Sequence, residues 1–264
     1  MCGRLTLTST PDDVRRLFGY EDRPNFPPRY NIAPTQPLAI VAAVEGRRRF
    51  LLVRWGFIPD WAKNPAELPL MINARAETVA AKPSFRAAIR HRRMLVPATG
   101  FYEWRQLKDG ATKGAATKQP YFIRPAETML MAFAGIWETF LGADGSEIDT
   151  AAILTVPANG LMRQIHDRMP AIVHPRDFDH WLDCRGTGVV DALALIPPVA
   201  DDHLEAFPVS TRVNSVRNDD EGLIEPLTEP LVSPDQAKPA REAEAERDLF
   251  GMLLKAQPKR GARK

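Results

Sequence analysis

The sequence predicts a single α+β domain with a strand-rich core and short peripheral helices. Short strand candidates recur along the chain, and residues 4–8 alternate with the period of two that is typical of strands. Segments that carry helix caps are few and short. With 264 residues, the chain is long enough to bury a sizeable core.

Each expected element has a local signal. Thr10 is a capping hydroxyl followed by proline and two acids, which predicts a helix that ends near Phe18. Residues 23–36 are rich in proline and predict a loop, and Glu45 and Gly46 predict a hairpin turn. The expected strands cover residues 4–8, 38–44, 48–55, 93–97, 101–107, 121–123, 130–137, 150–155, 171–173 and 207–213. The expected helices cover residues 10–18, 84–89, 158–164, 176–182 and 189–196.

Cysteine use and charge narrow the class of protein. Cys2 and Cys184 are too few for a disulfide framework or a zinc site, so we expect a reducing compartment, no metal and no cofactor, with Cys184 a buried structural thiol. The start lacks a secretory signal pattern, and no apolar run approaches the roughly 20 residues that span a bilayer, so we expect a cytoplasmic protein. Residues 86–93 concentrate arginine, either as a phosphate ligand or as a solvated helix face.

Two segments differ in composition from the rest of the chain. Residues 108–119 are rich in Gly, Ala, Thr and Lys and are expected to form a mobile hairpin loop. From residue 233, Ala, Glu, Lys and Pro dominate, and the last residues are strongly basic. We therefore expect one domain over residues 1–232 and a disordered or partly helical basic tail over residues 233–264, which adds sequence-independent attraction to phosphates.

Cys2 is the candidate reactive residue. If Met1 is removed, Cys2 carries both a thiol and a free α-amine, a pair that no internal cysteine has. The amine has a pKa of roughly 7.7–8.0 and the thiol one of about 8.5, so both are nucleophiles near neutral pH. The two together suit an aldehyde, because the amine forms a Schiff base and the thiol then closes a thiazolidine. The alternative is acyl transfer, in which the amine acts as base for its own thiol. The simplest interpretation is an accident of the start site.

Three polar residues stand in unusual local contexts. Asn73 lies where a strand is expected to end and enter a helix, either as a site residue or as a helix cap. Glu103 is flanked by aromatic residues, and burial among them would raise its pKa and let it move protons; an exposed edge-strand charge is the alternative. His166 ends an expected helix and is either an acid or base near pH 7 or a structural histidine. Arg4 and Arg75 are phosphate ligands or ordinary surface arginines.

The motifs that carry these residues occur together in the order of one family. The chain resembles the SRAP (SOS-response-associated peptidase) family, whose members shield abasic sites in single-stranded DNA. The resemblance covers about residues 1–230 and implies a barrel-like core. It is carried by residues 1–4 (MCGR), 30–34 (YNIAP), 55–59 (WGFIP), 73–78 (NARAET), 97–104 (PATGFYEW), 165–170 (IHDRMP) and 213–215 (VNS).

The resemblance implies a covalent reaction with a DNA lesion. The Cys2 amine and thiol would condense with the C1′ aldehyde of an abasic deoxyribose to give a thiazolidine crosslink. Asn73 would hold the Cys2 end of the chain, Glu103 would shuttle protons, and His166 would assist opening of the sugar ring and Schiff-base formation. The DNA-binding residues implied by the family are Arg4, Arg75 and Arg168 at phosphates, Trp61, Pro34 and Phe57 at bases, and Trp104 and Thr155.

The expected partner is single-stranded DNA, or a junction of single and double strands, that contains an abasic site. The protein is expected to act as a monomer, associated with the nucleoid when it is bound to damaged DNA. Two other functions remain open at the level of sequence. One is a thiol autopeptidase or cysteine peptidase in which Cys2 attacks a peptide carbonyl with help from His166 and Glu103. The other is a non-covalent reader of modified DNA, whose binding survives Cys2→Ala.

Overall fold

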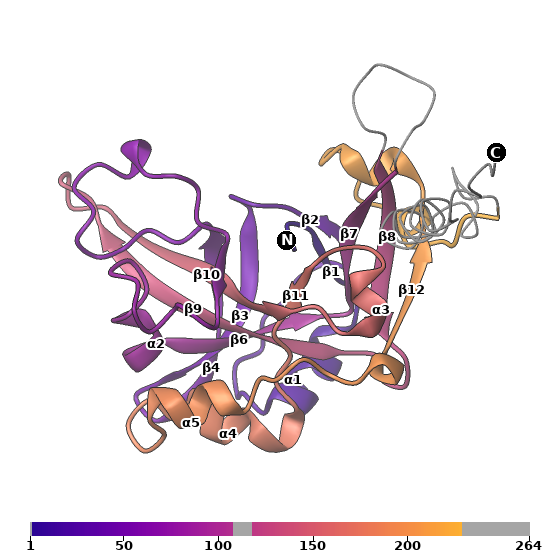
Figure 1. Cartoon of the computed structure of the whole chain (residues 1–264). Helices are drawn as coiled ribbons and strands as arrows, with labels where there is room; N and C mark the ends of the chain where they lie inside the picture. The colour runs from indigo at the N-terminus through magenta and orange to yellow at the C-terminus, as the bar shows by residue number, and fades with distance from the viewer. Residues whose placement is uncertain (1, 108–117, 229–264) are drawn as a thin grey trace, which may run out of the picture.

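Two β-sheets form the body of the molecule, and short helices lie at its periphery (Figure 1). The computed structural model describes residues 2–107 and 118–228. The strands are β1 (Leu5–Leu7), β2 (Arg29–Ile32), β3 (Pro37–Val44), β4 (Arg47–Trp55), β5 (Asn73–Arg75), β6 (Arg93–Ala98), β7 (Gly100–Gln106), β8 (Lys118–Pro125), β9 (Met131–Leu141), β10 (Glu147–Pro157), β11 (Arg168–Pro170) and β12 (Leu204–Pro208).

Five strands of the larger sheet close into a ring. The pairing runs β10–β4–β3–β6–β9 and returns from β9 to β10, so the α+β class with a barrel-like core is confirmed. Closure removes free edges from these strands. β10 also pairs outside this ring, because its last residues form hydrogen bonds with β5 on one side and β11 on the other.

The second sheet has the order β12–β8–β7–β1–β2 and packs against the barrel. Phe101 of β7 meets Phe133 of β9 edge to face, with ring centroids 5.7 Å apart. Gly100 is required where β7 begins, because a Cβ there would lie 2.2 Å from the ring of Phe122. Aromatic packing of this kind joins the two sheets into one core that reaches from Cys2 to the helices on the far side.

The helices are short, as the sequence predicts. They are α1 (Pro11–Phe18), α2 (Ala88–His91), α3 (Gly160–Arg163), α4 (Phe178–Leu182) and α5 (Val189–Ala194), with the 3-10 turns η1 (Pro65–Glu67), η2 (Pro175–Asp177), η3 (Asp201–His203), η4 (Thr211–Asn214) and η5 (Glu221–Leu223). Thr10 caps α1 by accepting the Asp13 N–H, and Gly19 ends it in the left-handed conformation, so the expected helix to Phe18 is confirmed.

Several expected boundaries were wrong where tertiary contacts decide the backbone. Residues 29–32, expected as loop, form β2 because β1 pairs with them. The helix expected over residues 84–89 is the four-residue α2 at Ala88–His91, preceded by turns. The strand expected over residues 171–173 lies earlier, at β11, with only an isolated bridge at Ile172. Residues 211–213, expected as extended, belong to η4.

The start of the described chain lies between the two sheets. Cys2 leads directly into β1, which is central in its sheet and pairs with both β2 and β7. Figure 1 shows this end of the chain between β10 on one side and β7 with α3 on the other. Among the described residues, no helix is long and apolar enough to cross a membrane. The fold thus holds the terminal segment firmly in the space between barrel and second sheet.

Candidate active site

The Cys2 end of the chain is held by Asn73. Cys2 is fully buried, and its backbone carbonyl accepts a hydrogen bond of 2.8 Å from Asn73 Nδ2. Asn73 is the first residue of β5 and pairs in parallel with Ile153 of β10, so the barrel positions the amide. The other end of the amide, Oδ1, is buried and has no hydrogen-bond partner in the described structure. Asn73 therefore orients Cys2 and keeps one acceptor available there.

Glu103 is a buried carboxylate whose charge acts on the Cys2 thiol. It lies on β7, flanked by β8 and β1, and is only 4% exposed, so the alternative of an exposed edge charge is wrong. Oε1 accepts the Trp104 N–H at 3.2 Å. Burial, together with the negative charge of Glu103, raises the pKa of the Cys2 thiol far above its ordinary range. The resting thiol is therefore protonated, and a neighbouring group has to accept its proton during reaction.

His166 has two partners for one ring nitrogen. Its Nδ1 lies 3.0 Å from the Arg168 backbone nitrogen and 2.8 Å from Asp167 Oδ1. A neutral ring accepts the Arg168 N–H at Nδ1 and carries its own proton at Nε2. A protonated ring instead donates from Nδ1 to the exposed Asp167. The geometry thus accommodates both protonation states, as an acid or base requires.

Glu103 and His166 line one cavity of about 660 Å³. Its walls are the outer half of β7, the start of β8, and the segment from α3 to Asp167. The negative charge of Glu103 acts on the Cys2 thiol, and neither Cys2 nor Asn73 lines this cavity. The structure therefore pairs Asn73 with Cys2, and it places Glu103 and His166 on the walls of one cavity.

Arg4 and Trp104 form a rigid wall beside this cavity. Arg4 donates to Asn31 Oδ1 at 2.9 Å and to the Val213 carbonyl at 2.7 Å, and its guanidinium lies 6.0 Å from the centre of the Trp104 ring. The Trp104 indole N–H donates to Asn214 Oδ1 at 2.8 Å. These contacts join the 213–215 motif to the start of the chain. Both terminal nitrogens of the Arg4 guanidinium are thus hydrogen-bonded within the protein.

Arg168 is fixed by an acid and by β10. Its guanidinium makes a two-bond ion pair with Glu77, whose pKa this pairing holds below the ordinary range, and it donates to the Thr155 carbonyl at 2.6 Å. The Arg168 Nε is buried and has no partner in the described structure. Glu77 was not singled out in the sequence. Its position two residues after Arg75 in the 73–78 motif is the signal that points to it.

The remaining predicted DNA-binding residues divide by exposure. Trp61 is 52% exposed, Arg75 is exposed without an acidic partner among the described residues, and Pro34 is partly exposed. Phe57 is 2% exposed and packs edge to face on Phe85, so the prediction that its ring stacks on a base is wrong for this conformation. Thr155 is fully buried and accepts a hydrogen bond from Arg168. Thr155 therefore positions Arg168 and offers no surface to DNA.

Three further expectations are settled by burial or by the limits of the described chain. Arg93, in the arginine-rich segment, is buried and donates to backbone carbonyls, so it is no phosphate ligand. Cys184, expected to be buried, is only partly so. Residues 108–117, most of the expected mobile loop, and the expected tail at residues 233–264 lie outside the described residues.

Asn31 is a functional residue that sequence reasoning missed. It is fully buried, accepts from Arg4, and its Nδ2 contacts the carbonyls of Val213, Ser215 and Asn218 at 2.8–3.2 Å. The 30–34 motif was noted, but a proline-rich context gave no reason to expect a buried amide. A polar residue between Tyr30 and Ile32, both strand formers, was the available signal.

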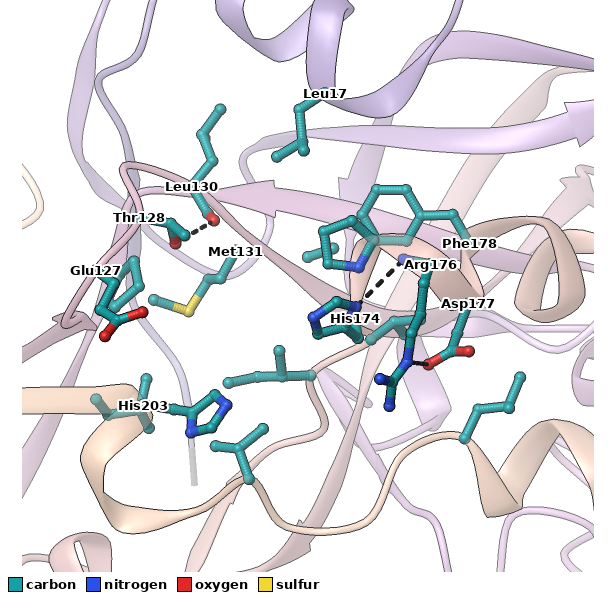
Figure 2. Close-up of a pocket in the computed structure, with 18 of the residues that line it drawn as sticks. Leu17, Glu127, Thr128, Leu130, Met131, His174, Arg176, Asp177, Phe178 and His203 are labelled. Carbon is teal, nitrogen blue, oxygen red and sulfur yellow. Dashed lines mark hydrogen bonds and ion pairs between the residues drawn. The ribbon is translucent and has the colours of Figure 1, made fainter.

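A second cavity lies elsewhere in the described structure. It has a volume of about 960 Å³ and is bounded by α1, the start of β9, the segment from Ile172 to Phe178, and η3. Figure 2 shows His174 and His203 at its rim and Leu130, Met131 and Phe178 around it. None of the predicted site residues lines this cavity. Within the described residues, no cluster of three or more potential ligands could hold a metal ion.

The fold joins a closed barrel to a second sheet, and it ties Cys2 to Asn73 at the start of the described chain. The model of the family described as SOS response associated peptidase (SRAP) matches residues 1–216, and the chain belongs to this family.

Curated relatives and solved structures agree with this assignment. The chain is 38% identical to abasic site processing protein YoqW of Bacillus subtilis over 228 residues, which are 85% of this chain and 99% of the relative. It is 30% identical to abasic site processing protein HMCES of Xenopus tropicalis, with 83% and 76% covered. A crystal structure of a phage-related protein from Bordetella bronchiseptica matches with a TM-score of 0.63 and 31% identity, covering 79% of this chain and 94% of that one.

Proposed function

We propose that this protein processes abasic sites in DNA by linking Cys2 covalently to the opened sugar. The observation that carries the proposal is the hydrogen bond from Asn73 to the Cys2 carbonyl. It is supported by the charge of Glu103, which acts on the Cys2 thiol and which lines a cavity together with His166. A residue held in this way presents its backbone nitrogen and its thiol in one fixed orientation. The curated relatives, which are named abasic site processing proteins, support the same substrate.

The chemistry needs Met1 to be removed so that the Cys2 nitrogen becomes an amine. The amine attacks the C1′ aldehyde of the ring-opened deoxyribose, a C–N bond forms, and water leaves to give a Schiff base. The thiol sulfur then bonds to the same carbon, its proton leaves, and the nitrogen takes up a proton. The product is a thiazolidine with no net oxidation or reduction. Orientation of the two nucleophiles supplies several kcal/mol of the barrier.

Glu103 and His166 are assigned the proton transfers. Because the pKa of the Cys2 thiol is raised, ring closure requires a base. Glu103 is assigned this role, since it is a buried carboxylate whose charge acts on the thiol. A neutral His166 that accepts the Arg168 N–H at Nδ1 presents Nε2–H as a donor, which suits the ring oxygen of the closed sugar.

Contacts with the DNA strand are assigned to the exposed residues. Arg75 binds a phosphate, and Trp61 with Pro34 stacks on bases beside the lesion. Arg4, Trp104 and Arg168 shape the wall of the site and reach the strand with the donors that the protein leaves available. A single strand or a junction is the substrate, because pairing buries the sugar, and a lesion without a base costs little to expose. We also propose that the protein acts as a monomer in the cytoplasm.

The test uses a single-stranded oligonucleotide with one abasic site. Incubation with the protein should give a shifted band on a denaturing gel, and mass spectrometry of the intact protein should show loss of Met1. Cys2→Ala should abolish the band. Cys2→Ser keeps the amine and should give only an adduct that a reductant traps. A non-covalent reader of modified DNA would instead bind equally well with Cys2→Ala, and no band would form with the wild type.

A further inference from the structure

Each of the three polar residues around Cys2 has an arginine close by in the chain. These arginines are Arg75 on β5, Arg105 on β7 and Arg163 on α3. Arg105 follows Glu103 by two positions, so both side chains leave the same face of β7, about 7 Å apart along the strand. Arg163 lies one turn before His166. The arrangement repeats one pattern, a site residue with a cation next to it, on three separate elements.

Arg105 and Arg163 line the same cavity from different walls. The cavity that holds Glu103 and His166 is bounded by Arg105 on β7 and by Arg163 on α3. Arg75 does not line it, because β5 belongs to the barrel sheet and pairs with β10. Arg105 and Arg163 are therefore the arginines of this cavity, and Arg75 lies outside it.

The contacts of Arg163 leave its fork directed outward. Its Nε donates to the Ala158 carbonyl at 3.1 Å, which fixes the stem, and the side chain is exposed with no acidic partner in the described chain. A guanidinium held at Nε presents two terminal nitrogens in a fixed plane, the geometry that binds phosphate oxygens. Arg163 is thus pre-oriented at the rim of the cavity.

The charge of the cavity favours an anion along its length. Its cations are Arg105, Arg163 and, near the open end, the exposed Lys118. Its acids are Glu103, which is buried beside Cys2, and Asp167, which lies 2.8 Å from His166. Both acids are therefore next to the reactive residues, and the cations occupy the walls and the mouth. A chain of phosphates that passes the reactive centre would meet positive charge on leaving it.

We propose that Arg105 and Arg163, with Lys118 at the mouth, bind the phosphate backbone of the strand that continues from the lesion on the side away from Arg75. The proposal rests on the proposed function and specifies its substrate. The protein takes an abasic residue inside a strand, with nucleotides held on both sides by separate groups of cations. Neither arginine touches the reacting atoms, so they are strand-binding residues and not catalytic residues.

The first experiment compares where the lesion lies in the oligonucleotide. Three single strands of equal length carry the abasic residue near the 5′ end, in the middle or near the 3′ end. R105A/R163A should crosslink the internal lesion roughly tenfold more slowly than the wild type at low salt, the effect of losing charge-assisted contacts. It should match the wild type on one of the two terminal lesions, the one with no nucleotides on this flank. R75A should show the opposite preference.

Two variants make the comparison specific. R23A/R47A removes the same charge from exposed arginines at residue 23 and on β4, which are not part of the cavity, and should behave as the wild type on all three strands. R105K/R163K keeps the charge and should recover most of the rate. Equal losses on all three strands, or the same end preference as R75A, would overturn the proposal.

A second measurement separates binding from chemistry. A strand with a tetrahydrofuran abasic analogue has no aldehyde, so its anisotropy reports binding alone. The plot of log affinity against log salt should be flatter by about 1.4 for R105A/R163A, since each lost phosphate contact contributes about 0.7 on a single strand. An unchanged slope overturns the proposal. Mass spectrometry with 2-deoxyribose 5-phosphate then tests the proposed function itself, because this small aldehyde should add to Cys2 equally in the wild type and in R105A/R163A.

Discussion

Two regions of this molecule bury an arginine, and they treat it differently. On the far side of the barrel, Arg93 donates to the carbonyls of Ile89, Trp181, Asp183 and Thr187, so its whole fork is bound by backbone. At the site, Arg168 pairs with Glu77 and Thr155 but leaves its Nε buried without a partner in the described structure.

The same contrast extends beyond the arginines. Four buried polar side-chain atoms lack a partner in the described structure, and three of them, on Asn73, Thr78 and Arg168, belong to the segments that surround the site. Native proteins pair nearly all buried polar groups, so such a concentration is unusual. The comparison shows that Arg93 in the scaffold has hydrogen-bond partners for its whole guanidinium. The site segments instead contain buried polar atoms that a bound molecule or water can still pair with.

The largest expected effect concerns Arg93, whose guanidinium is fully hydrogen-bonded to backbone. Arg93→Met should lower the free energy of unfolding by about 3–5 kcal/mol, because several buried carbonyls lose their donor together. Urea denaturation measures the loss. Arg16→Met is the control, since Arg16 is exposed and pairs with Asp13 on the surface of α1, and should cost about 1 kcal/mol or less. Equal costs for the two variants would contradict the contrast between the regions.

The next effect concerns the carboxylate beside Cys2. Glu103→Gln should slow crosslinking by at least about 10²-fold if Glu103 moves protons. It should also bring the raised pKa of the Cys2 thiol closer to its ordinary value, because one of the two causes, the negative charge, is gone while burial remains. Alkylation of Cys2 against pH, in a Cys184→Ser background, should therefore begin at lower pH. A pH profile that does not move would show that the charge of Glu103 does not act on this thiol.

Asn73→Ala should separate stability from activity. The variant loses the hydrogen bond to Cys2 and also removes the buried, unpaired Oδ1. The free energy of unfolding should therefore change by about 1 kcal/mol or less. Crosslinking should fall roughly ten- to hundredfold, because the Cys2 end is no longer oriented. Gel assays and urea denaturation on the same sample measure both. Parallel losses of stability and rate would assign Asn73 to the scaffold.

The smallest effect is a pH dependence at Glu77. The hydrogen bonds from Arg168 lower the pKa of this carboxyl in the folded state, so its contribution is present above the unfolded pKa of about 4.3 and is lost as pH falls through the folded value. Because the side chain is 45% exposed, the contribution at pH 7 should be about 1 kcal/mol or less. Stability curves of the wild type and Glu77→Gln should converge at acid pH, and curves that stay parallel would count against the pairing.

Much of the fold and the outline of the site could be predicted from the sequence. Alternation with period two located β1, and the cap at Thr10 with the expected end near Phe18 located α1. Glu103 was predictable as a buried acid because aromatic residues flank it on a strand. Asn73 and His166 were selected by unusual context and by the family motifs; the structure pairs Asn73 with Cys2 and places His166 on the cavity that Glu103 lines.

The rest depends on contacts that local sequence does not encode. An aromatic-rich loop does not show which ring is buried, and so Phe57 was assigned to DNA while Trp61 is the exposed one. A run of arginines does not show that Arg93 turns inward. β2 forms in a proline-rich segment only because β1 supplies hydrogen bonds from far away in the chain. In each case a long-range partner decides the outcome.

The place of β1 in its sheet has a mechanical consequence. β1 lies between β2 and β7, with antiparallel neighbours on both sides, and Cys2 leads straight into it. Tension applied to a nucleic acid strand anchored at Cys2 would load these interstrand bonds in shear, all at once, and would not peel them apart one by one. A polymerase or helicase that pulls on such a strand would thus be resisted by the hydrogen bonds of β1 to β2 and β7.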